Sequence, residues 1–261
     1  MVNADRKCND LSGKEWLQNS FSIWRDLTKT KEEKSLKHPA SYPVSLCEKL
    51  LKTFSKNGGR VLDPFNGTGS SMVAAHNLGF SGVGIDLSKE FCEIAKKRVD
   101  NDNKIKIING DSFVEIEKLP ENDFDICITS PPYWNILNMK RSADGKETVN
   151  YSDKDNDLGN IPDYNDFLSS LRQLFSKIGR TLKPGAYCVI NVMDLRKKNQ
   201  FYPLHSDLAA EMKAIDYVYD DLIIWDRQQD YNNMRPLGYP YRFRINKVHE
   251  YLLILINQKE G

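Results

Sequence analysis

The sequence predicts an α/β domain with a seven-stranded, mainly parallel sheet, an antiparallel edge hairpin and helices on both faces. Short apolar segments typical of buried strands alternate with amphipathic segments typical of helices. The last two apolar segments have no helix between them, so we expect them to pair antiparallel. A glycine-rich turn follows the first strand and precedes a helix. In an open sheet of this kind, ligands lie beyond the carboxyl ends of the strands.

The elements follow in order along the chain. Apolar residues at helical spacing predict helices at 16–27 and, behind Pro43, at 44–54. Strands are predicted at 60–65, 81–87, 104–110, 124–130, 186–192, 221–225 and 249–257. The intervening helices are predicted at 70–78, 89–99, 113–119, 164–182 and 204–215. No repeat or Gly/Ser linker divides the chain, so we expect one domain over 1–261, with 1–57 as a helical N-terminal part.

Composition excludes several classes of protein. The 37 Lys and Arg against 36 Asp and Glu leave a net charge of +1, so a local patch must hold any polyanion. Five widely spaced cysteines without a CxxC pair argue against disulfides and structural zinc, and His205 and His249 lack partner ligands at metal-binding spacing. No terminal apolar run approaches the ~20 residues of a membrane span, and no signal peptide is evident. We expect a cytoplasmic protein without metal or membrane.

The glycine-rich turn at 63–70 is the first candidate binding element. Gly67 and Gly69 let the backbone approach a ligand, and the following helix offers unpaired N–H groups. A turn that merely needs positive φ is an equal alternative. Asp86 follows at the end of the next strand, where a carboxylate can accept the hydroxyl protons of a ribose. The competing interpretation is that Asp86 caps the helix starting near Ser88.

The third strand ends in Asp111 and Ser112, where an acid and a hydroxyl could meet an adenine edge, although helix capping competes. The first turn lacks the full GxGxxG pattern, because Met72 and Val73 follow Ser70. A pyrophosphate cradle is therefore not expected. The expected ligand is a nucleoside with a small polar tail that carries no phosphate.

The fourth strand ends in Thr129-Ser130-Pro131-Pro132-Tyr133-Trp134, the most specific motif in the chain. Two prolines fix consecutive φ angles and remove two N–H donors, which leaves Ser130 and the Pro131 carbonyl as preset acceptors beside aromatic rings. A simple strand terminator is the alternative. A terminator would not require Ser before the prolines or Tyr-Trp after them, so we favour a functional motif.

In this order and spacing, the DPFNGTGS turn, the GID, the NGDS and the TSPPY resemble the S-adenosylmethionine-dependent amino-methyltransferases of DNA, of the N4-cytosine/N6-adenine type. The upstream HPASYP segment at 38–43 is similar to a family segment that helps hold the methionine end of the cofactor. The resemblance runs from about His38 to Ile256. It implies a Rossmann-like methyltransferase fold with the catalytic core at 58–261.

The resemblance also implies roles for individual residues. Ser130, Pro131, Pro132 and Tyr133 would hold the target base. The residues implied to bind S-adenosylmethionine are His38, Pro39, Tyr42, Asp63, Pro64, Phe65, Gly67, Gly69, Ser70, Asp86, Asp111 and Ser112. Ser rather than Asp before PPY favours cytosine N4 over adenine N6 as the target.

The chemistry agrees with these roles. The lone pair of a base's exocyclic amine is delocalised into the ring, so acceptors at Ser130 Oγ and the Pro131 carbonyl are needed to draw its hydrogens and aim it at the methyl group. No strong base is needed, because the sulfonium is a good leaving group, and in-line positioning supplies much of the rate. An amine paired within a duplex must be flipped out, and Tyr133 would stack on the flipped base.

Relatives in this linear order normally add a long target-recognition region, so sequence reading here must use short segments. The segment 135–162 is polar, with net charge −1, and 226–248 has net charge +3 with interleaved aromatics. The second is the better candidate for DNA contact, although a solvated hairpin is the alternative. The candidate nucleic-acid-binding residues are Trp134, Arg227, Arg235, Arg242, Arg244 and Lys247. A second basic run, 196–198, is expected to be an exposed turn.

The leading hypothesis is therefore methylation of double-stranded DNA, with cytosine N4 as the preferred target. Adenine N6, an RNA base, and a non-catalytic nucleic-acid-binding subunit of the same fold are the alternatives. The intact turn and the intact SPPY motif argue against the non-catalytic alternative. A cognate restriction endonuclease or a specificity subunit is a candidate partner, and the sequence leaves the oligomeric state open.

Overall fold

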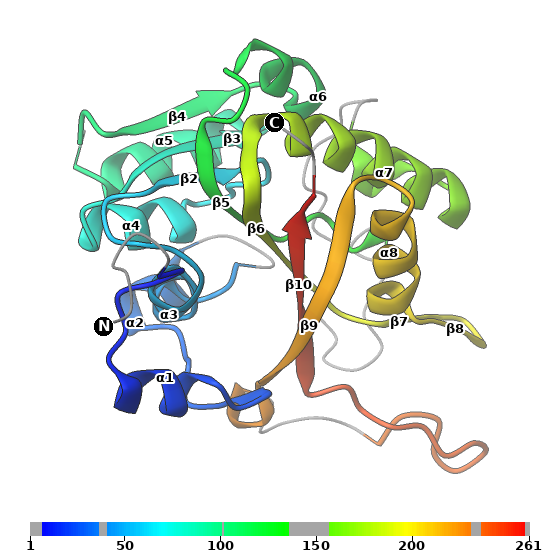
Figure 1. Ribbon diagram of the computed structural model, residues 1–261. Helices are drawn as coiled ribbons and strands as arrows, with labels where there is room; N and C mark the ends of the chain where they lie inside the picture. The colour runs from blue at the N-terminus through cyan, green and yellow to red at the C-terminus, as the bar shows by residue number, and fades with distance from the viewer. Residues whose placement is uncertain (1–6, 37–40, 101, 136–156, 231–235, 259–261) are drawn as a thin grey trace.

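A computed structural model of the chain describes residues 7–36, 41–100, 102–135, 157–230 and 236–258. One sheet dominates it, with the strand order β1-β9-β10-β6-β5-β2-β3-β4 (Figure 1). Its strands are β1 (Ile23–Trp24), β2 (Arg60–Asp63), β3 (Ser81–Asp86), β4 (Ile105–Asn109), β5 (Phe124–Thr129), β6 (Leu182–Val192), β9 (Tyr217–Asp226) and β10 (His249–Asn257). A separate hairpin pairs β7 (Leu195–Lys197) with β8 (Gln200–Tyr202). The predicted α/β class and parallel core are confirmed.

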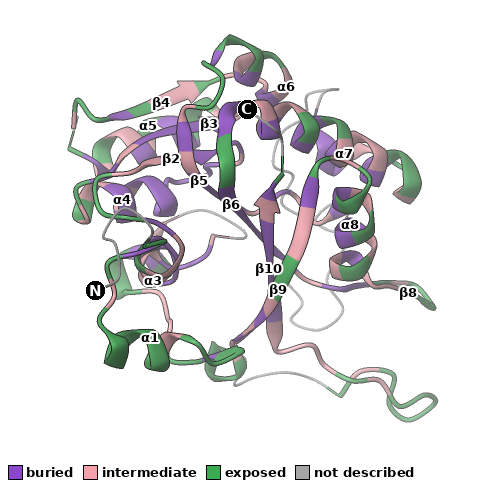
Figure 2. Cartoon of the chain, viewed as in Figure 1, coloured by how far each residue is buried: buried purple, intermediate pink, exposed green. Residues whose placement is uncertain are grey.

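Helices cover both faces of the sheet. The α-helices are α1 (Gly13–Asn19), α2 (Lys31–Ser35), α3 (Val44–Phe54), α4 (Ser70–Asn77), α5 (Lys89–Arg98), α6 (Ser112–Glu115), α7 (Tyr164–Thr181) and α8 (Leu204–Lys213). Successive strand residues point to opposite faces, so Val61 packs under α3 and α4 while Leu62 packs under α7. Both faces of the central strands are therefore apolar, and Figure 2 shows them buried. Within the described residues, no helix is long and apolar enough to cross a membrane.

The sheet has eight strands in the described part of the chain rather than the seven predicted. The helix expected at 16–27 is wrong beyond Asn19: α1 begins after Ser12, and β1 then pairs parallel with β9. Trp24, only 1% exposed, packs into the core, whereas Trp16 is 51% exposed. Pairing with β9 satisfies strand hydrogen bonds that a helix at 16–27 would have left open.

Two other boundaries differ from the prediction. The helix expected at 113–119 is split into α6 and a 3₁₀ turn at Ile116–Lys118. The predicted antiparallel pairing of the last two strands is confirmed, and β10 is also antiparallel to β6. β9 is twice as long as the strand expected at 221–225, because β10 pairs with it along its full length.

The parallel order of β5, β2, β3 and β4 brings four carboxyl ends to one edge of the sheet. Asp63, Asp86, Asn109 and Thr129 are the last residues of these strands. The chemistry-bearing loops identified from the sequence therefore come together at one place, as expected for an open α/β sheet.

Candidate active site

A cavity of about 870 Å³, its open mouth included, lies at these carboxyl ends. Ten of the residues proposed from the sequence line it: Tyr42, Pro64, Phe65, Gly67, Ser70, Asp86, Asp111, Ser112, Ser130 and Pro132. Pro131 and Tyr133 lie beside the cavity, and His38 and Pro39 fall outside the described residues. One cavity thus joins the predicted cofactor residues to the SPPY motif.

The glycine-rich turn needs its glycines for backbone geometry. Gly67 and Gly69 both have positive φ, at 50° and 85°. A Cβ on Gly69 would lie 2.8 Å from the Cβ of Ala95, so α5 can pack closely only against a glycine. Gly67 lines the cavity and donates its N–H to Asp86 Oδ2 at 2.7 Å. The turn is therefore shaped both by the positive φ of its glycines and by the hydrogen bond to the next strand.

Asp63 is a structural hub behind the wall of the cavity. Its carboxylate is fully buried and accepts hydrogen bonds from Tyr42 Oη at 2.9 Å, Ser71 Oγ at 2.5 Å and Thr129 Oγ1 at 2.7 Å. The Phe65 N–H donates a fourth at 3.0 Å. Burial raises the pKa of Asp63, and these donors oppose that rise. The structure therefore places Asp63 as the tie between β2, α4 and β5 rather than in the cavity lining.

Asp86 faces the cavity at the end of β3. Its two carboxylate oxygens accept from the Gly67 and Ser88 N–H groups at 2.7 and 2.8 Å. Ser88, not Asp86, provides the side-chain cap of α5. Burial raises the pKa of Asp86 to about 6, although both backbone donors lower it. A half-buried carboxylate with spare lone pairs is well suited to accept hydroxyl protons from a ligand.

At the end of β4, the capping alternative for Asp111 is realised. Asp111 Oδ1 accepts from the Phe113 N–H at 2.9 Å, and the residue caps α6 while also lining the cavity. Ser112 Oγ donates to the Pro64 carbonyl. This bond ties the β4 loop to the glycine-rich turn, so Ser112 shapes the cavity wall.

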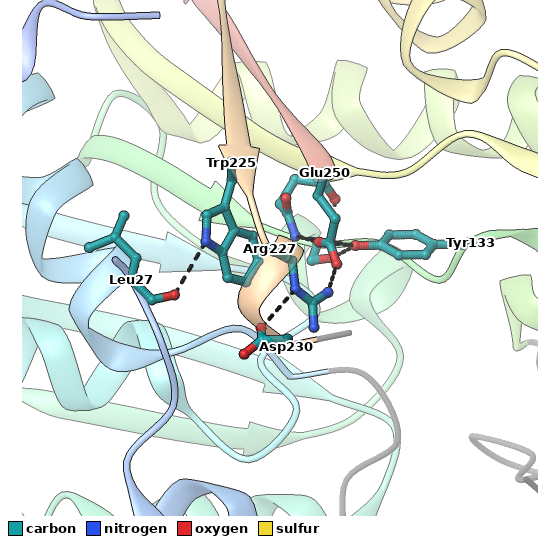
Figure 3. Close-up of polar contacts among 8 residues, drawn as sticks. Leu27, Tyr133, Trp225, Arg227, Asp230 and Glu250 are labelled. Carbon is teal, nitrogen blue, oxygen red and sulfur yellow. Dashed lines mark hydrogen bonds and ion pairs between the residues drawn. The ribbon is translucent and has the colours of Figure 1, made fainter. Parts of the chain in front are cut away.

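The SPPY motif is held by a buried polar network that the sequence did not predict. Ser130 Oγ donates to the Asn191 carbonyl at 3.1 Å. Tyr133 Oη donates to Glu250 Oε2 at 2.9 Å, and Asn191 Nδ2 donates to the same oxygen at 2.6 Å. Glu250 also pairs with Arg227, which contacts Asp230 (Figure 3). The motif after β5 is thus fastened to β6, β10 and the end of β9.

Glu250 is the residue that sequence reasoning missed in this network. It is only 4% exposed and stands second in the strongly apolar β10 segment. A carboxylate almost never lies fully buried without a partner. The sequence signal for Glu250 is a charged residue inside an otherwise apolar strand. The sequence does not show which residues pair with it.

The described candidates for nucleic-acid contact separate into inward-facing residues and residues on an extended segment. Trp134 is 5% exposed, and its Nε1 donates to the Ile161 carbonyl at 2.9 Å, so it belongs to the core. Arg227 is turned inward to Glu250, as described above. Arg235 lies outside the described residues, as does most of 135–162. Arg242, Arg244 and Lys247 lie on segment 236–248, named here the arm, which extends away from the sheet (Figure 1).

The histidines have structural surroundings. His205 Nδ1 lies 2.7 Å from Asp194 Oδ1, and its ring stacks on Tyr251 with the centroids 3.9 Å apart. Burial lowers the pKa of His249, and the nearby charge of Lys247 lowers it further. Among the described residues, no three His, Cys, Asp or Glu side chains gather as metal ligands.

The chain is similar in sequence to known methyltransferases. The chain is similar to the Type II methyltransferase M2.DpnII of Streptococcus pneumoniae, 40% identical over 83 residues, 31% of each chain. It is also 40% identical over 97 residues to the Type II methyltransferase M.HpaI of Haemophilus parainfluenzae, 37% of this chain and 29% of that one. The match thus spans about 30% of the length of these relatives.

A SAM-dependent O-methyltransferase structure from Thermotoga maritima covers 87% of this chain and 70% of its own, at 13% identity and a TM-score of 0.50. That similarity shows the fold alone, and it is the methyltransferase fold. A methyltransferase domain profile matches residues 62–143. The DNA methylase profile matches residues 3–97 and 124–261, and by this match over most of its length the chain belongs to the DNA methylase family.

Proposed function

We propose that this protein transfers a methyl group from S-adenosylmethionine to the exocyclic amine of a DNA base flipped out of the duplex. The observation that carries this proposal is the single cavity that adjoins both Asp86 and Ser130. A cofactor bound along the β2 and β3 loops would then meet a base held at the end of β5. Family membership supports the reaction class.

The cofactor half of the cavity fits S-adenosylmethionine. Asp86 would accept the ribose hydroxyls, and Phe65 and Phe113 supply apolar walls. Asn66 and Thr68 line the cavity, and Thr68 Oγ1 is buried without a hydrogen-bond partner among the described residues. Buried polar atoms are normally satisfied, so the Thr68 hydroxyl supports a polar ligand such as the methionine tail. S-adenosylmethionine supplies a methyl group on a sulfonium, which needs no further activation.

The base half explains how the amine becomes nucleophilic. Ser130 directs its own proton to the Asn191 carbonyl, so its lone pairs remain to accept a hydrogen of the base's amine. The Pro131 carbonyl would accept the second hydrogen. The half-buried Tyr133 ring, fixed by Glu250, would stack on the base. Proximity and alignment then account for much of the rate.

Ser at position 130 favours cytosine N4 as the target, with adenine N6 as the alternative in the same site. Double-stranded DNA is the proposed substrate, and a restriction endonuclease or specificity subunit is the candidate partner. Relatives named as Type II methyltransferases support this setting.

The test is expression in cells that lack DNA methylation, followed by mass spectrometry of digested DNA nucleosides. We expect N4-methylcytosine from the wild-type protein and at least a tenfold decrease for Ser130→Ala. The matched control is the half-buried Ser170→Ala on α7, whose hydroxyl bonds only to the Asp166 carbonyl of the same helix, and it should leave the yield unchanged. Detection of N6-methyladenine in place of N4-methylcytosine would show that adenine, not cytosine, is the target. Absence of any methylated DNA nucleoside, with S-adenosylmethionine binding intact, would refute DNA methylation.

Affinity for S-adenosylmethionine is expected to fall as the pH drops below about 6. The pKa of Asp86 is raised to about 6, so its carboxylate is progressively protonated below that pH and loses acceptor capacity. Affinity should decline about tenfold per pH unit well below this pKa, because binding requires the ionised form. Titration calorimetry between pH 5 and 8 measures it. Asp86→Asn should give weak binding with a flat profile, and a flat wild-type profile would contradict the role of Asp86.

A further inference from the structure

The tip of the β7–β8 hairpin lies against the arm, although about 40 residues separate them in sequence. Arg244 Nη2 of the arm donates to Asn199 Oδ1 of the hairpin at 2.8 Å. Two cations lie near the Phe201 ring, with the Arg196 guanidinium 5.3 Å and the Lys247 ammonium 5.1 Å from its centroid. Cations at such distances are attracted to the ring face. The basic run expected to be an exposed turn is therefore half of a two-part structure.

This two-part structure carries a concentrated positive charge. Residues 195–202 and 236–248 contain no Asp or Glu. Their cations are Arg196, Lys197, Lys198, Arg242, Arg244 and Lys247, and none forms an ion pair within the described part of the chain. Desolvation, together with the nearby charges of Arg196 and Arg242, lowers the pKa of Arg244. Like charges held together without a carboxylate form a site for an anion.

The cationic surface reaches the SPPY motif through Lys197. The Lys197 ammonium lies 3.9 Å from the centroid of Trp134, the residue directly after Tyr133. It also donates to Asn135 Oδ1 at 3.0 Å. The hairpin thus begins next to the proposed base-binding motif and ends at the arm.

Exposed aromatic side chains accompany the charges on the arm. Tyr241 and Phe243 are 95% and 93% exposed, and they flank Arg242. Aromatic rings beside arginines are suited to stacking on bases, while the cations suit phosphates. A flexible acidic peptide would need only the cations, so the alternation of rings and cations favours nucleic acid.

We infer that the β7–β8 tip and the arm form one DNA-contacting surface, in which Arg196 and Lys198 hold backbone phosphates beside the flipped base. This inference rests on the proposed function. Phosphate contacts fix the position of a duplex without reading its sequence. The surface explains how a chain with a net charge of only +1 can hold a polyanion.

The experiment uses the double substitution Arg196→Ala/Lys198→Ala, called the hairpin variant. Its control, Lys97→Ala/Lys106→Ala, removes the same number of positive charges. Lys97 and Lys106 are exposed and lie on α5 and on β4, the strand at the opposite edge of the sheet. Duplex binding is measured by fluorescence anisotropy from 50 to 300 mM salt. The plot of log K against log salt has a negative slope of about 0.9 per phosphate contact. The hairpin variant loses two contacts, so the magnitude of its slope should fall by about 2. The loss should be similar for duplexes of different sequence, and S-adenosylmethionine affinity should not change.

The inferred role of this surface would be contradicted by an unchanged salt slope in the hairpin variant. It would also be contradicted by an equal decrease in slope in the control. The same preparations are assayed for DNA methylation at low salt, which separates the two proposals. If the wild-type protein methylates DNA while the hairpin variant keeps the wild-type slope, the surface is wrong and the function stands. If the wild-type protein neither methylates nor binds duplex DNA, both are wrong.

Discussion

Tyr133→Ala is expected to lower kcat/KM for DNA methylation by about 10- to 100-fold. Stacking of a base on an aromatic ring contributes ~1–3 kcal/mol, and the substitution removes the ring as well as the bond to Glu250. Tyr133→Phe keeps the ring and loses only the hydroxyl, which bonds to Glu250 and lies 3.2 Å from both Ser130 Oγ and Asn191 Nδ2. A decrease of about 2- to 10-fold is expected. Steady-state kinetics on a duplex substrate measure both. Equal losses for the two variants would contradict stacking by Tyr133.

The buried network predicts that Glu250 is a positioning residue that acts through Tyr133. Glu250→Gln retains side-chain volume, but it removes the charge that pairs with Arg227 and replaces one acceptor oxygen by a donor. In a double-mutant cycle, Glu250→Gln should cost little further kcat once Tyr133→Phe is present, because the shared bond is already lost. A purely structural role would instead give additive losses in kcat and equal losses in thermal stability. Circular dichroism melting provides that second readout.

Asp63→Asn is expected to destabilise the fold by about 2–4 kcal/mol. Each carboxylate oxygen accepts two hydrogen bonds, one oxygen from Tyr42 and Ser71 and the other from Thr129 and the Phe65 N–H. An amide nitrogen at either place would face two donors, and a buried unsatisfied group costs ~1–3 kcal/mol. For a chain of this size, that is a decrease in Tm of about 5–15 °C.

Differential scanning calorimetry of Asp63→Asn, with Asp220→Asn as the matched control on exposed surface, measures this effect. The control should change the free energy of unfolding by no more than about 0.5 kcal/mol. An unchanged Tm combined with lost S-adenosylmethionine binding would show instead that Asp63 contacts the cofactor directly.

Much of the site could be predicted because its parts are local in sequence. Gly67 and Gly69 need positive φ in a turn between a strand and a helix, whatever surrounds them. Asp86 ends a strand that must be parallel to β2, so its position at the cavity follows from the order of elements. The choice of Ser88 over Asp86 as the α5 cap was open, because both lie within one turn of the helix start.

The errors arose where a residue's partner lies far away along the chain. Segment 16–27 has helical spacing, but Ile23 and Trp24 pair with Ile224 and Trp225, about 200 residues later. Periodicity reports which residues are apolar and cannot report such a pairing. Trp134 likewise looked available for DNA, and only the fold brings the Ile161 carbonyl to its indole N–H.

The α/β class, the glycine-rich turn and the SPPY motif could be recognised in the sequence alone, because periods of two and 3.6 residues and turn chemistry act over a few residues. By contrast, the ion pair between Arg227 and Glu250, and the contact of the β7–β8 hairpin with the arm, are visible only in the folded chain. A buried carboxylate pairs with a cation that lies close to it in the folded chain. An exposed cation without a nearby carboxylate forms no ion pair. Those outcomes depend on distances in space, which spacing along the chain does not specify.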